Sequence, residues 1–321
     1  MQFSIQKGYV YILLNAVIFS SVEITLKLSA GAFDPIQITM LRFLIGGLIL
    51  LPFSISSLKQ RGLKIAKSDF KHFMLTGLLF ITFSMTIYQI AITYTQASVV
   101  AVVFSGNPIF VTILAYFFLK ETITKHNIAA LFLEICGIIA IINPFHNEIS
   151  LRGIVLTVIS ALIFALYAVA SQDKAKYYGG LTVSAYSFIF GGLQLLALIL
   201  LAKIPAIDAL LPSVGLSIFR DVPLLAGLSL ETMPLFFCIC VINTAFGFYC
   251  YMKALELTSA HEVSITFFLK PVLAPIFAVI LIHEYIPFNM MIGIGFFLAA
   301  SLISLLPQFK QVPDASPGRT E

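Results

Sequence analysis

Ten long apolar runs, separated by short polar segments, make up most of the chain. Each run is long enough for a helix that crosses the hydrocarbon core of a bilayer, which takes roughly 20 residues. A helix also satisfies its own backbone hydrogen-bonding groups, as lipid requires. The pattern therefore predicts ten membrane-spanning helices, at residues 8–28, 36–57, 71–94, 97–119, 127–144, 152–173, 181–202, 233–256, 260–282 and 287–306.

Two connections between the runs are longer than the rest, and one of them is basic. Residues 58–70 carry three lysines and one arginine, whereas residues 203–232 carry three prolines and charges of both signs. Lys and Arg gather on the cytoplasmic side of membrane proteins. With the amino terminus inside, thirteen of them fall on the inner side and five on the outer side. This asymmetry predicts that both termini are cytoplasmic, which requires an even number of spans.

The composition agrees with a protein that lies in lipid. Hydrophobic residues make up 60% of the 321 residues and charged residues 11%, whereas a soluble domain is about 25% charged. The net charge of +4 is too small for a nucleic-acid-binding surface, so the lipid bilayer is the expected partner of the outer surface. The four cysteines lie in apolar runs, which favours small buried side chains over disulfides or metal ligands.

The second half of the chain repeats the first. Shifted by 145 residues, Arg42-Phe-Leu-Ile-Gly-Gly-Leu48 falls on Ser187-Phe-Ile-Phe-Gly-Gly-Leu193. Shifted by 163 residues, Pro108 falls on Pro271. The two shifts differ by 18 residues, which corresponds to an insertion in the connection 203–232 of the second half.

The repeat defines two units of five spans each, at residues 1–146 and 147–308, followed by a polar tail at 309–321 that we expect to be disordered and cytoplasmic. Because five is an odd number, the second unit lies inverted in the membrane relative to the first. Two inverted units can exchange conformations, so that one site near the midplane opens to each side in turn. The predicted fold class is therefore an all-α integral membrane protein whose ten transmembrane helices form two inverted five-helix repeats.

Three segments, Leu41-Arg-Phe-Leu-Ile-Gly-Gly47, Asn107-Pro-Ile-Phe110 and Lys270-Pro-Val-Leu-Ala-Pro-Ile276, share a pattern with a known family. They resemble the EamA type of the drug/metabolite transporter (DMT) superfamily, over nearly the whole chain. The chain departs from the family at Phe19-Ser20, where a Trp-Gly pair is usual. The resemblance implies a transporter of amino acids, nucleobases, drugs or other metabolites in the plasma (inner) membrane of a prokaryote. It also implies a central cavity between the first, third, fourth, sixth, eighth and ninth spans.

Lys270 is an ionisable residue near the middle of the ninth span, and ionisable residues at that depth commonly serve a function. Pro271 and Pro275 follow it, and prolines free backbone carbonyl groups by breaking a helix. Lys270 is therefore a candidate for binding a carboxylate or phosphate of a solute, or a partner of a buried Glu. Asn107, its mate in the repeat beside Pro108, is a candidate for hydrogen bonds to the solute or to a neighbouring helix.

Three charged residues of the first two spans, Glu23, Lys27 and Arg42, lie toward the predicted outer side. Lys27 follows Glu23 by one helical turn, and the three side chains are expected to form one cluster inside the bundle. Glu23 is a candidate for a proton-coupling carboxylate or for a structural network, whereas a structural role is favoured for the two cations. Glu134 in the fifth span needs a partner from another helix, for which Lys270 is a candidate, and it is likewise either a coupling or a structural residue.

Other polar and aromatic residues within the spans are candidates for the lining of a solute cavity. They are Asn15, Tyr88, Gln89, Tyr167, Asn243 and Tyr251. The phenylalanines carry no specific signal and are interpreted as lipid-facing or packing residues. The Gly-Gly pairs at 46–47 and 191–192 are expected to let helices pack closely.

The sequence offers no site for an ATP-driven or enzymatic reaction. It has no Gly-rich phosphate loop followed by Lys, and its two His-Glu pairs lack the second His of a zinc protease. We therefore expect no enzyme activity, no cofactor and no bound metal.

The leading hypothesis is a secondary transporter that moves a small metabolite by alternating access. The charge of Lys270 favours an amino acid or another carboxylate-bearing solute, and protons are a candidate coupling ion. One alternative is a membrane scaffold subunit, which would tolerate the loss of Lys270, Glu23 and Glu134. The other alternative is an intramembrane enzyme, which would need a nucleophile and a base that the sequence does not offer together. Neither the oligomeric state nor the direction of transport follows from the sequence.

Overall fold

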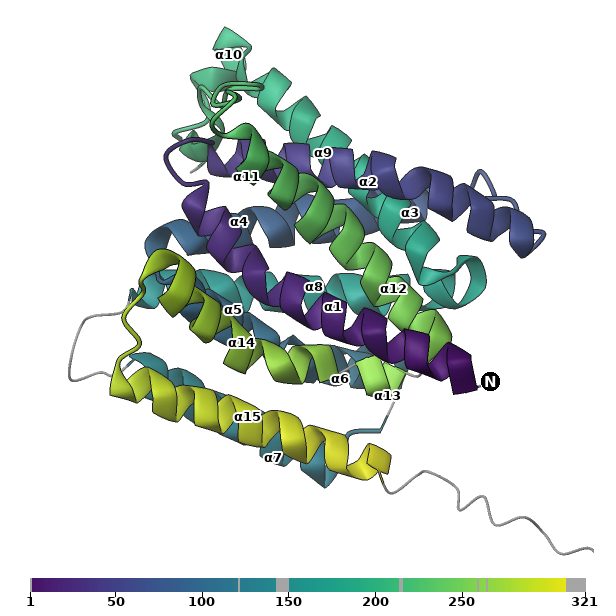
Figure 1. The fold of residues 1–321 in the computed structure, drawn as a ribbon. Coiled ribbons are helices and arrows are strands. Elements are labelled where there is room, and N and C mark those ends of the chain that lie inside the picture. The colour runs from purple at the N-terminus through teal and green to yellow at the C-terminus, as the bar shows by residue number, and fades with distance from the viewer. Residues whose placement is uncertain are drawn as a thin grey trace, which may run out of the picture.

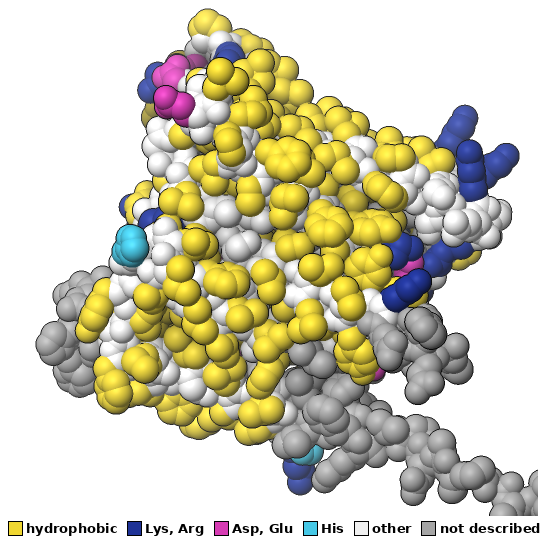
Figure 2. Space-filling view, viewed as in Figure 1, with side chains coloured by type: hydrophobic (Ala, Val, Ile, Leu, Met, Phe, Trp, Pro, Cys, Tyr) yellow, Lys and Arg dark blue, Asp and Glu magenta, His cyan; other side chains and the backbone are white. Residues whose placement is uncertain are grey.

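The computed structural model describes residues 2–120, 122–142, 150–213, 216–258, 260–263 and 265–309, which form a bundle of ten spans (Figure 1). Eight spans are long and apolar enough to cross a membrane, and the last two are shorter apolar helices, at 266–282 and 288–304. Figure 2 shows one face of the bundle, which is apolar over most of its height and carries Lys and Arg mainly at its two ends. The predicted all-α membrane fold is confirmed.

The first half contains five spans, and the third and fourth are each divided into segments. The elements are α1 (Gln2–Leu28), α2 (Pro35–Gln60), α3 (Asp69–Gly77), η1 (Leu78–Met85), α4 (Thr86–Tyr94), α5 (Ala97–Ser105), α6 (Asn107–Leu119) and α7 (Lys125–Ile142). The third span consists of α3, η1 and α4, and the fourth of α5 and α6. The element η1 is a π-helix, which is wound more widely than an α-helix.

The second half repeats this order of elements. Its elements are α8 (Leu151–Tyr178), α9 (Gly180–Ala202), α10 (Pro205–Asp208), η2 (Ser217–Phe219), α11 (Met233–Phe237), η3 (Cys238–Phe246), α12 (Gly247–Leu257), α13 (Ala260–Val263), α14 (Ile265–Ile282) and α15 (Phe288–Phe309). The short elements α10 and η2 belong to the long connection. A second π-helix, η3, lies in the eighth span, which is the repeat mate of the span that contains η1. The unit boundaries at 146 and 308 stay predictions, and the predicted tail lies outside the described residues, except that α15 extends to Phe309.

The two halves pack by making the same contact twice. A Cβ atom on Gly47 would lie 2.9 Å from the backbone nitrogen of Ile189, and one on Gly192 would lie 3.0 Å from that of Leu44. The repeat shift of 145 residues carries Gly47 onto Gly192 and Leu44 onto Ile189, as a two-fold axis between α2 and α9 requires. Only glycine allows so close an approach of the two backbones, so the predicted packing role of these glycines is confirmed.

Other helices of the two halves are paired in the same way. The helix α1 packs against α12 and α14, and its mate α8 packs against α4, α5 and α6. The fifth helices of the halves, α7 and α15, lie against each other at one edge of the bundle (Figure 1). Inverted repeats are therefore visible in the contacts as well as in the sequence.

Prolines interrupt the helix of the fourth span but not that of the ninth span. The fourth span is interrupted between α5 and α6, where Pro108 occupies the first turn of α6, as predicted. The predicted breaks at Pro271 and Pro275 are wrong, because α14 runs through both residues. A proline removes one backbone donor, and a transmembrane helix can continue when its neighbours support it. Here α1 packs along α14 and supplies a side-chain partner for Lys270.

The two ends of the bundle differ, and α1 begins at the end where α15 finishes (Figure 1). We call this the terminal end, and we call the opposite end, which carries the long connection 203–232, the loop end. In that connection Arg220 donates from Nε and Nη2 to the two carboxylate oxygens of Asp208, at 2.7 and 2.8 Å. These hydrogen bonds lower the pKa of Asp208 below its usual value.

Candidate functional site

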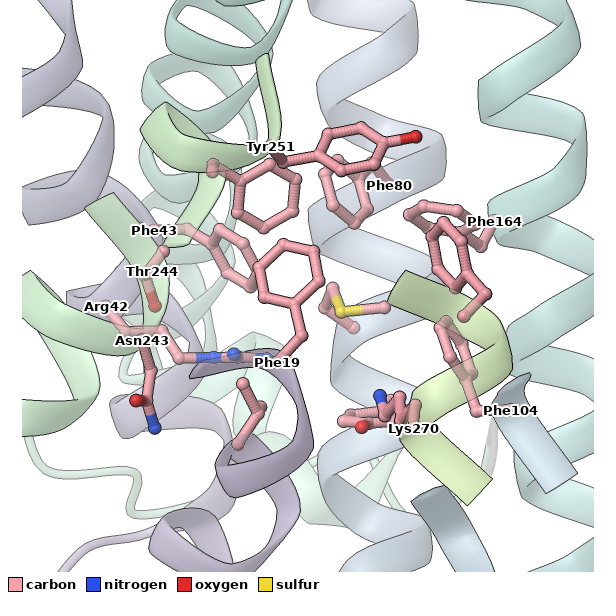
Figure 3. A pocket seen from close by; sticks show the side chains of 15 residues that line it. Phe19, Arg42, Phe43, Phe80, Phe104, Phe164, Asn243, Thr244, Tyr251 and Lys270 are labelled. Atoms are coloured by element: carbon pink, nitrogen blue, oxygen red, sulfur yellow. The ribbon is translucent and has the colours of Figure 1, made fainter. Parts of the chain in front are cut away.

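A cavity of about 660 Å³, counting the space that opens beyond its walls, is lined by helices of both halves. Its lining comes from the six spans that the resemblance implied and, in addition, from the second span. Phenylalanine rings form much of the wall (Figure 3). The polar lining residues are Arg42, Tyr88, Asn243, Thr244, Tyr251 and Lys270. We call this space the central cavity.

The two π-helices both contribute to the central cavity. Phe80 and Met85 of η1 line it on the first half, and Asn243 and Thr244 of η3 line it on the second. Thr244 uses its Oγ1 atom to donate to the carbonyl oxygen of Ile239, five residues earlier. Wide turns of this kind occur frequently at functional sites, and no feature of the sequence pattern predicted them.

Lys270 has a carboxylate partner inside the bundle. Its Nζ atom lies 2.6 Å from Oε1 of Glu23, and only 6% of Lys270 and none of Glu23 is exposed. The hydroxyl of Tyr88 donates to the same carboxylate oxygen. The Lys270 ammonium also lies 5.6 Å from the centre of the Phe104 ring. Glu23, and not Glu134, is thus the buried partner of Lys270.

The predicted cluster of Glu23, Lys27 and Arg42 does not form. Lys27 donates from Nζ to the carbonyl oxygens of Ile92 and Thr95, at 2.7 Å each, where α4 ends. The prediction failed because helical spacing fixes the face of a residue but not the helix that this face meets. These contacts support the structural role that was favoured for Lys27, since a cation near the last carbonyls of a helix satisfies them.

The loop end is held together by one further carboxylate. Glu284, just beyond α14, accepts hydrogen bonds from the backbone of Ala97 and Ser98 at 2.7 and 3.1 Å, and from the Ser98 hydroxyl at 2.6 Å. It therefore caps the start of α5 in the other half. Together with Lys27, it joins α1, the third and fourth spans and α14 at the loop end.

Arg42 lines the central cavity and lacks a counter-ion. It is 4% exposed, and its Nε and Nη2 atoms are buried without a hydrogen-bond partner. It belongs to none of the four ion pairs found among the described residues. Its guanidinium lies 4.3 Å from the centre of the Phe43 ring and extends from α2 toward the middle of the cavity (Figure 3). Arg42 is therefore a buried cation whose Nε and Nη2 atoms make no hydrogen bond within the described residues.

The remaining predicted lining residues fall into two groups. Tyr88, Asn243 and Tyr251 line the central cavity, and Asn243 donates to Thr25 Oγ1 at 2.5 Å. Asn15 and Asn107 lie outside the lining and donate to the backbone of neighbouring spans, as do many polar side chains between membrane helices.

Asn107 takes the second of its two proposed roles, because its amide donates to the carbonyl oxygen of Ala161 in α8 at 2.8 Å. Gln89 is buried outside the lining, and its Oε1 atom has no hydrogen-bond partner. Tyr167 stacks on Phe80, with 4.4 Å between ring centres, and lines a different cavity.

That second cavity lies toward the terminal end, and we call it the vestibule. It encloses about 1560 Å³, counting open space, and is lined by parts of α6, α8, α9 and α12 toward the terminal end, including Gln172 and Lys176. Phe164, Phe248 and Tyr251 line both the vestibule and the central cavity. These three side chains thus form the partition between the two spaces.

Glu134 lies in a third, smaller pocket and is 5% exposed. The pocket encloses about 360 Å³, and its polar lining consists of Glu134 and three serines of α5 and α15. A Cβ atom at Gly106, the residue between α5 and α6, would lie 2.6 Å from the Glu134 carboxylate. Phe267 lines both this pocket and the central cavity. Glu134 is in none of the ion pairs of the described residues, so the predicted pairing with Lys270 is wrong.

Seven phenylalanines of the central cavity were missed by the sequence interpretation, which assigned this residue type to lipid contact or packing. They are Phe19, Phe43, Phe80, Phe104, Phe164, Phe248 and Phe267. A ring that faces lipid and a ring that faces an apolar cavity obey the same hydrophobic pattern. One usable signal existed: Phe267 precedes Lys270 by three residues, which places both on one helix face.

Two inverted five-helix halves around a cavity that holds buried charges define a membrane transporter. The chain belongs to the EamA-like transporter family, which it matches over residues 6–143 and 151–306. The resemblance to EamA proteins of the DMT superfamily is thereby confirmed. The protein is a multi-pass membrane transporter with a small-molecule substrate, and it is not an enzyme.

Prokaryotic relatives and a solved structure agree with this assignment. A transporter of Clostridium kluyveri is 34% identical over 307 residues, which covers 93% of each chain. The transporter YoaV of Bacillus subtilis is 22% identical over 277 residues, covering 84% of this chain and 87% of YoaV. This chain also superposes on a protein of known crystal structure with a TM-score of 0.62 at 15% identity. The superposition covers 95% of this chain and 98% of the other chain, which shows the shared fold.

Proposed function

We propose that this protein is a secondary transporter that moves a small carboxylate-bearing metabolite across the plasma membrane by alternating access. The observation that carries the proposal is the central cavity, which is lined by both halves and holds the buried cations Arg42 and Lys270. Buried charges in the interior of a membrane bundle mark solute or ion pathways. A scaffold subunit would have no need of such a cavity.

The described conformation supports alternating access. At the loop end, Lys27 and Glu284 join the helices around the central cavity. At the terminal end, Phe164, Phe248 and Tyr251 separate the cavity from the vestibule. We propose that rocking of the halves opens the loop end while it narrows the vestibule. The solute then leaves on the side opposite to its entry.

The basic connection 58–70 supports a cytoplasmic position of the terminal end, because Lys and Arg gather on the cytoplasmic side of membrane proteins. The described conformation is then open inward. In a variant with all four native cysteines replaced by Ala, we expect Gln172→Cys in the vestibule to react with a membrane-impermeant thiol reagent in inside-out vesicles. It should resist the reagent in right-side-out vesicles, and Ser229→Cys in the exposed loop-end connection should show the opposite pattern. Equal labelling of both variants in both preparations would rule out this orientation.

Glu134 is our candidate for the proton-binding residue. A carboxyl group buried in apolar surroundings without a cation is stable when it binds a proton. The side chain of Phe267 forms a wall shared by the pocket of Glu134 and the central cavity, and it lies about one turn from Lys270 on α14. No other ionisable residue lines this pocket among the described residues. Binding of a proton at Glu134 is therefore able to influence α14 at the solute site.

The experiment that tests transport is counterflow in proteoliposomes with a labelled panel of amino acids and other carboxylates. We expect saturable exchange of at least one member of the panel, and none in protein-free liposomes. A purified protein that remains folded but exchanges no member of a broad panel would contradict the proposed function and favour the scaffold alternative.

A further inference from the structure

Arg42 lines the central cavity, and one edge of its guanidinium has no hydrogen-bond partner. The two buried atoms without partners are Nε and Nη2, whose N–H groups point side by side from one edge of the guanidinium. Arg220 uses these same two atoms to hold both oxygens of Asp208. Such a two-fold contact is the strongest that arginine makes with a carboxylate. The empty edge of Arg42 therefore matches a carboxylate of the solute.

Lys270 does not offer the same opportunity. Its ammonium already lies 2.6 Å from Glu23, whose charge neutralises it. Two buried cations and one buried carboxylate leave a single positive charge at the central cavity. In a site of low dielectric, one uncompensated positive charge favours a solute with one negative charge.

The walls of the central cavity indicate the chemistry of the solute apart from its carboxylate. Phe43 and Phe80 lie on the side of the central cavity away from Lys270 (Figure 3), and Phe248 also lines the cavity. Lys270 and Tyr88 both contact Oε1 of Glu23, and Oε2 of Glu23 is buried without a partner. An ammonium group on the solute that approached Oε2 would still meet the two cations Lys270 and Arg42. The lining therefore suits an apolar or aromatic body without a positive charge.

We infer that Arg42 binds the carboxylate of the solute and that the site prefers an amphipathic monocarboxylate to the zwitterionic amino acid with the same side chain. This inference rests on the proposed function of the central cavity as the solute site. It assigns to Arg42 the recognition role that the sequence suggested for Lys270.

The test is binding to the purified full-length protein in detergent, measured by calorimetry and thermal shift with 3-phenylpropionate, L-phenylalanine and 3-phenylpropan-1-ol. We expect 3-phenylpropionate to bind most tightly. Arg42→Gln should weaken its binding by about tenfold to a hundredfold, as expected for the loss of a charge-assisted hydrogen-bonded pair. Arg152→Gln is the matched control, because Arg152 also lies over a ring, that of Tyr94 at 4.5 Å, but is exposed.

The stability of Arg42→Gln separates recognition from a structural role. Removing an unpaired buried charge should leave the melting temperature without ligand unchanged or raise it, whereas loss of a structural residue would lower it. If Arg42→Gln does not fold, Arg42→Lys keeps the charge but loses the two-fold contact, and should still bind 3-phenylpropionate about tenfold more weakly.

Binding of 3-phenylpropionate that is unaffected by either Arg42 variant would overturn the inference. So would L-phenylalanine or the alcohol binding as tightly as the acid. Counterflow of some other solute, without any binding of 3-phenylpropionate, would leave the proposed function standing and refute this inference alone. Absence of counterflow for every solute would instead refute the proposed function.

Discussion

Lys270→Met should abolish solute exchange and destabilise the protein by about 3–5 kcal/mol, because it leaves the Glu23 carboxylate buried without its cation. Glu23 has no exposed surface, and Tyr88 is its other hydrogen-bond partner. Nothing else in the described cavity can neutralise it except Arg42, whose free N–H groups make no contact with it. Thermal unfolding in detergent and counterflow in proteoliposomes measure the two effects.

The double variant Glu23→Gln/Lys270→Met is the control for this prediction. Replacing both members of a buried ion pair is often neutral, so we expect its stability to return to within about 1 kcal/mol of the parent protein. The net charge of the cavity is unchanged when one cation and one carboxylate are lost together. Solute exchange should therefore return with stability.

The two variants discriminate between two roles of Lys270. Exchange that stays absent in a stable double variant would show that Lys270 or Glu23 takes part in exchange beyond stabilising the fold. A single Lys270→Met variant as stable as the parent protein would show that the ion pair with Glu23 does not form.

The spans and the repeat could be predicted because few backbone structures can cross a lipid bilayer. A chain that crosses the bilayer must form helices or a closed β-barrel, and apolar runs of about 20 residues fit helices. Ten such runs therefore predict ten spanning helices. The repeated Gly-Gly pairs then locate the closest contact, since Gly47 and Gly192 are where α2 and α9 meet. Hydropathy and repetition therefore define the architecture without any knowledge of the partners of each side chain.

The site was predicted less completely because it depends on how each helix is rotated about its axis. The depths of Lys270 and Glu134 are compatible with a pair, yet Lys270 faces α1 and Glu134 faces the break between α5 and α6. Lys27 and Glu23 share a helix face, but the longer reach of Lys27 takes it to the end of α4. No periodicity of hydrophobic residues contains this information.

The unpaired state of Arg42 is likewise a property of the packing. The sequence shows a cation in the second span, and a partner in lipid is expected for it. Only the structure shows that Glu23 pairs with Lys270 through Oε1 and that two nitrogen atoms of Arg42 have no hydrogen-bond partner. A residue favoured as structural thereby becomes the main candidate for solute recognition.

Glu134→Gln should retain counterflow of the solute but lose accumulation driven by a pH gradient. Gln has nearly the same shape as a protonated Glu, so the pocket beside Gly106 keeps its packing and the exchange of solute on both sides continues. The amide cannot release or bind a proton, so the solute gradient is no longer coupled to protons. In the parent protein, one proton per solute would sustain a gradient of about tenfold per pH unit.

The matched control for this variant is Glu256→Gln, which removes an exposed carboxylate that pairs with Lys253 at 2.7 Å on α12. It should exchange and accumulate solute like the parent protein, and protein-free liposomes account for passive entry of a protonated acid. Accumulation by Glu134→Gln equal to that of the parent would make Glu134 a structural residue of the α5–α6 break. If the parent protein exchanges solute but a pH gradient drives no accumulation, protons are excluded as the coupling ion. Glu134 would then have no role in proton transfer between the two faces of the membrane.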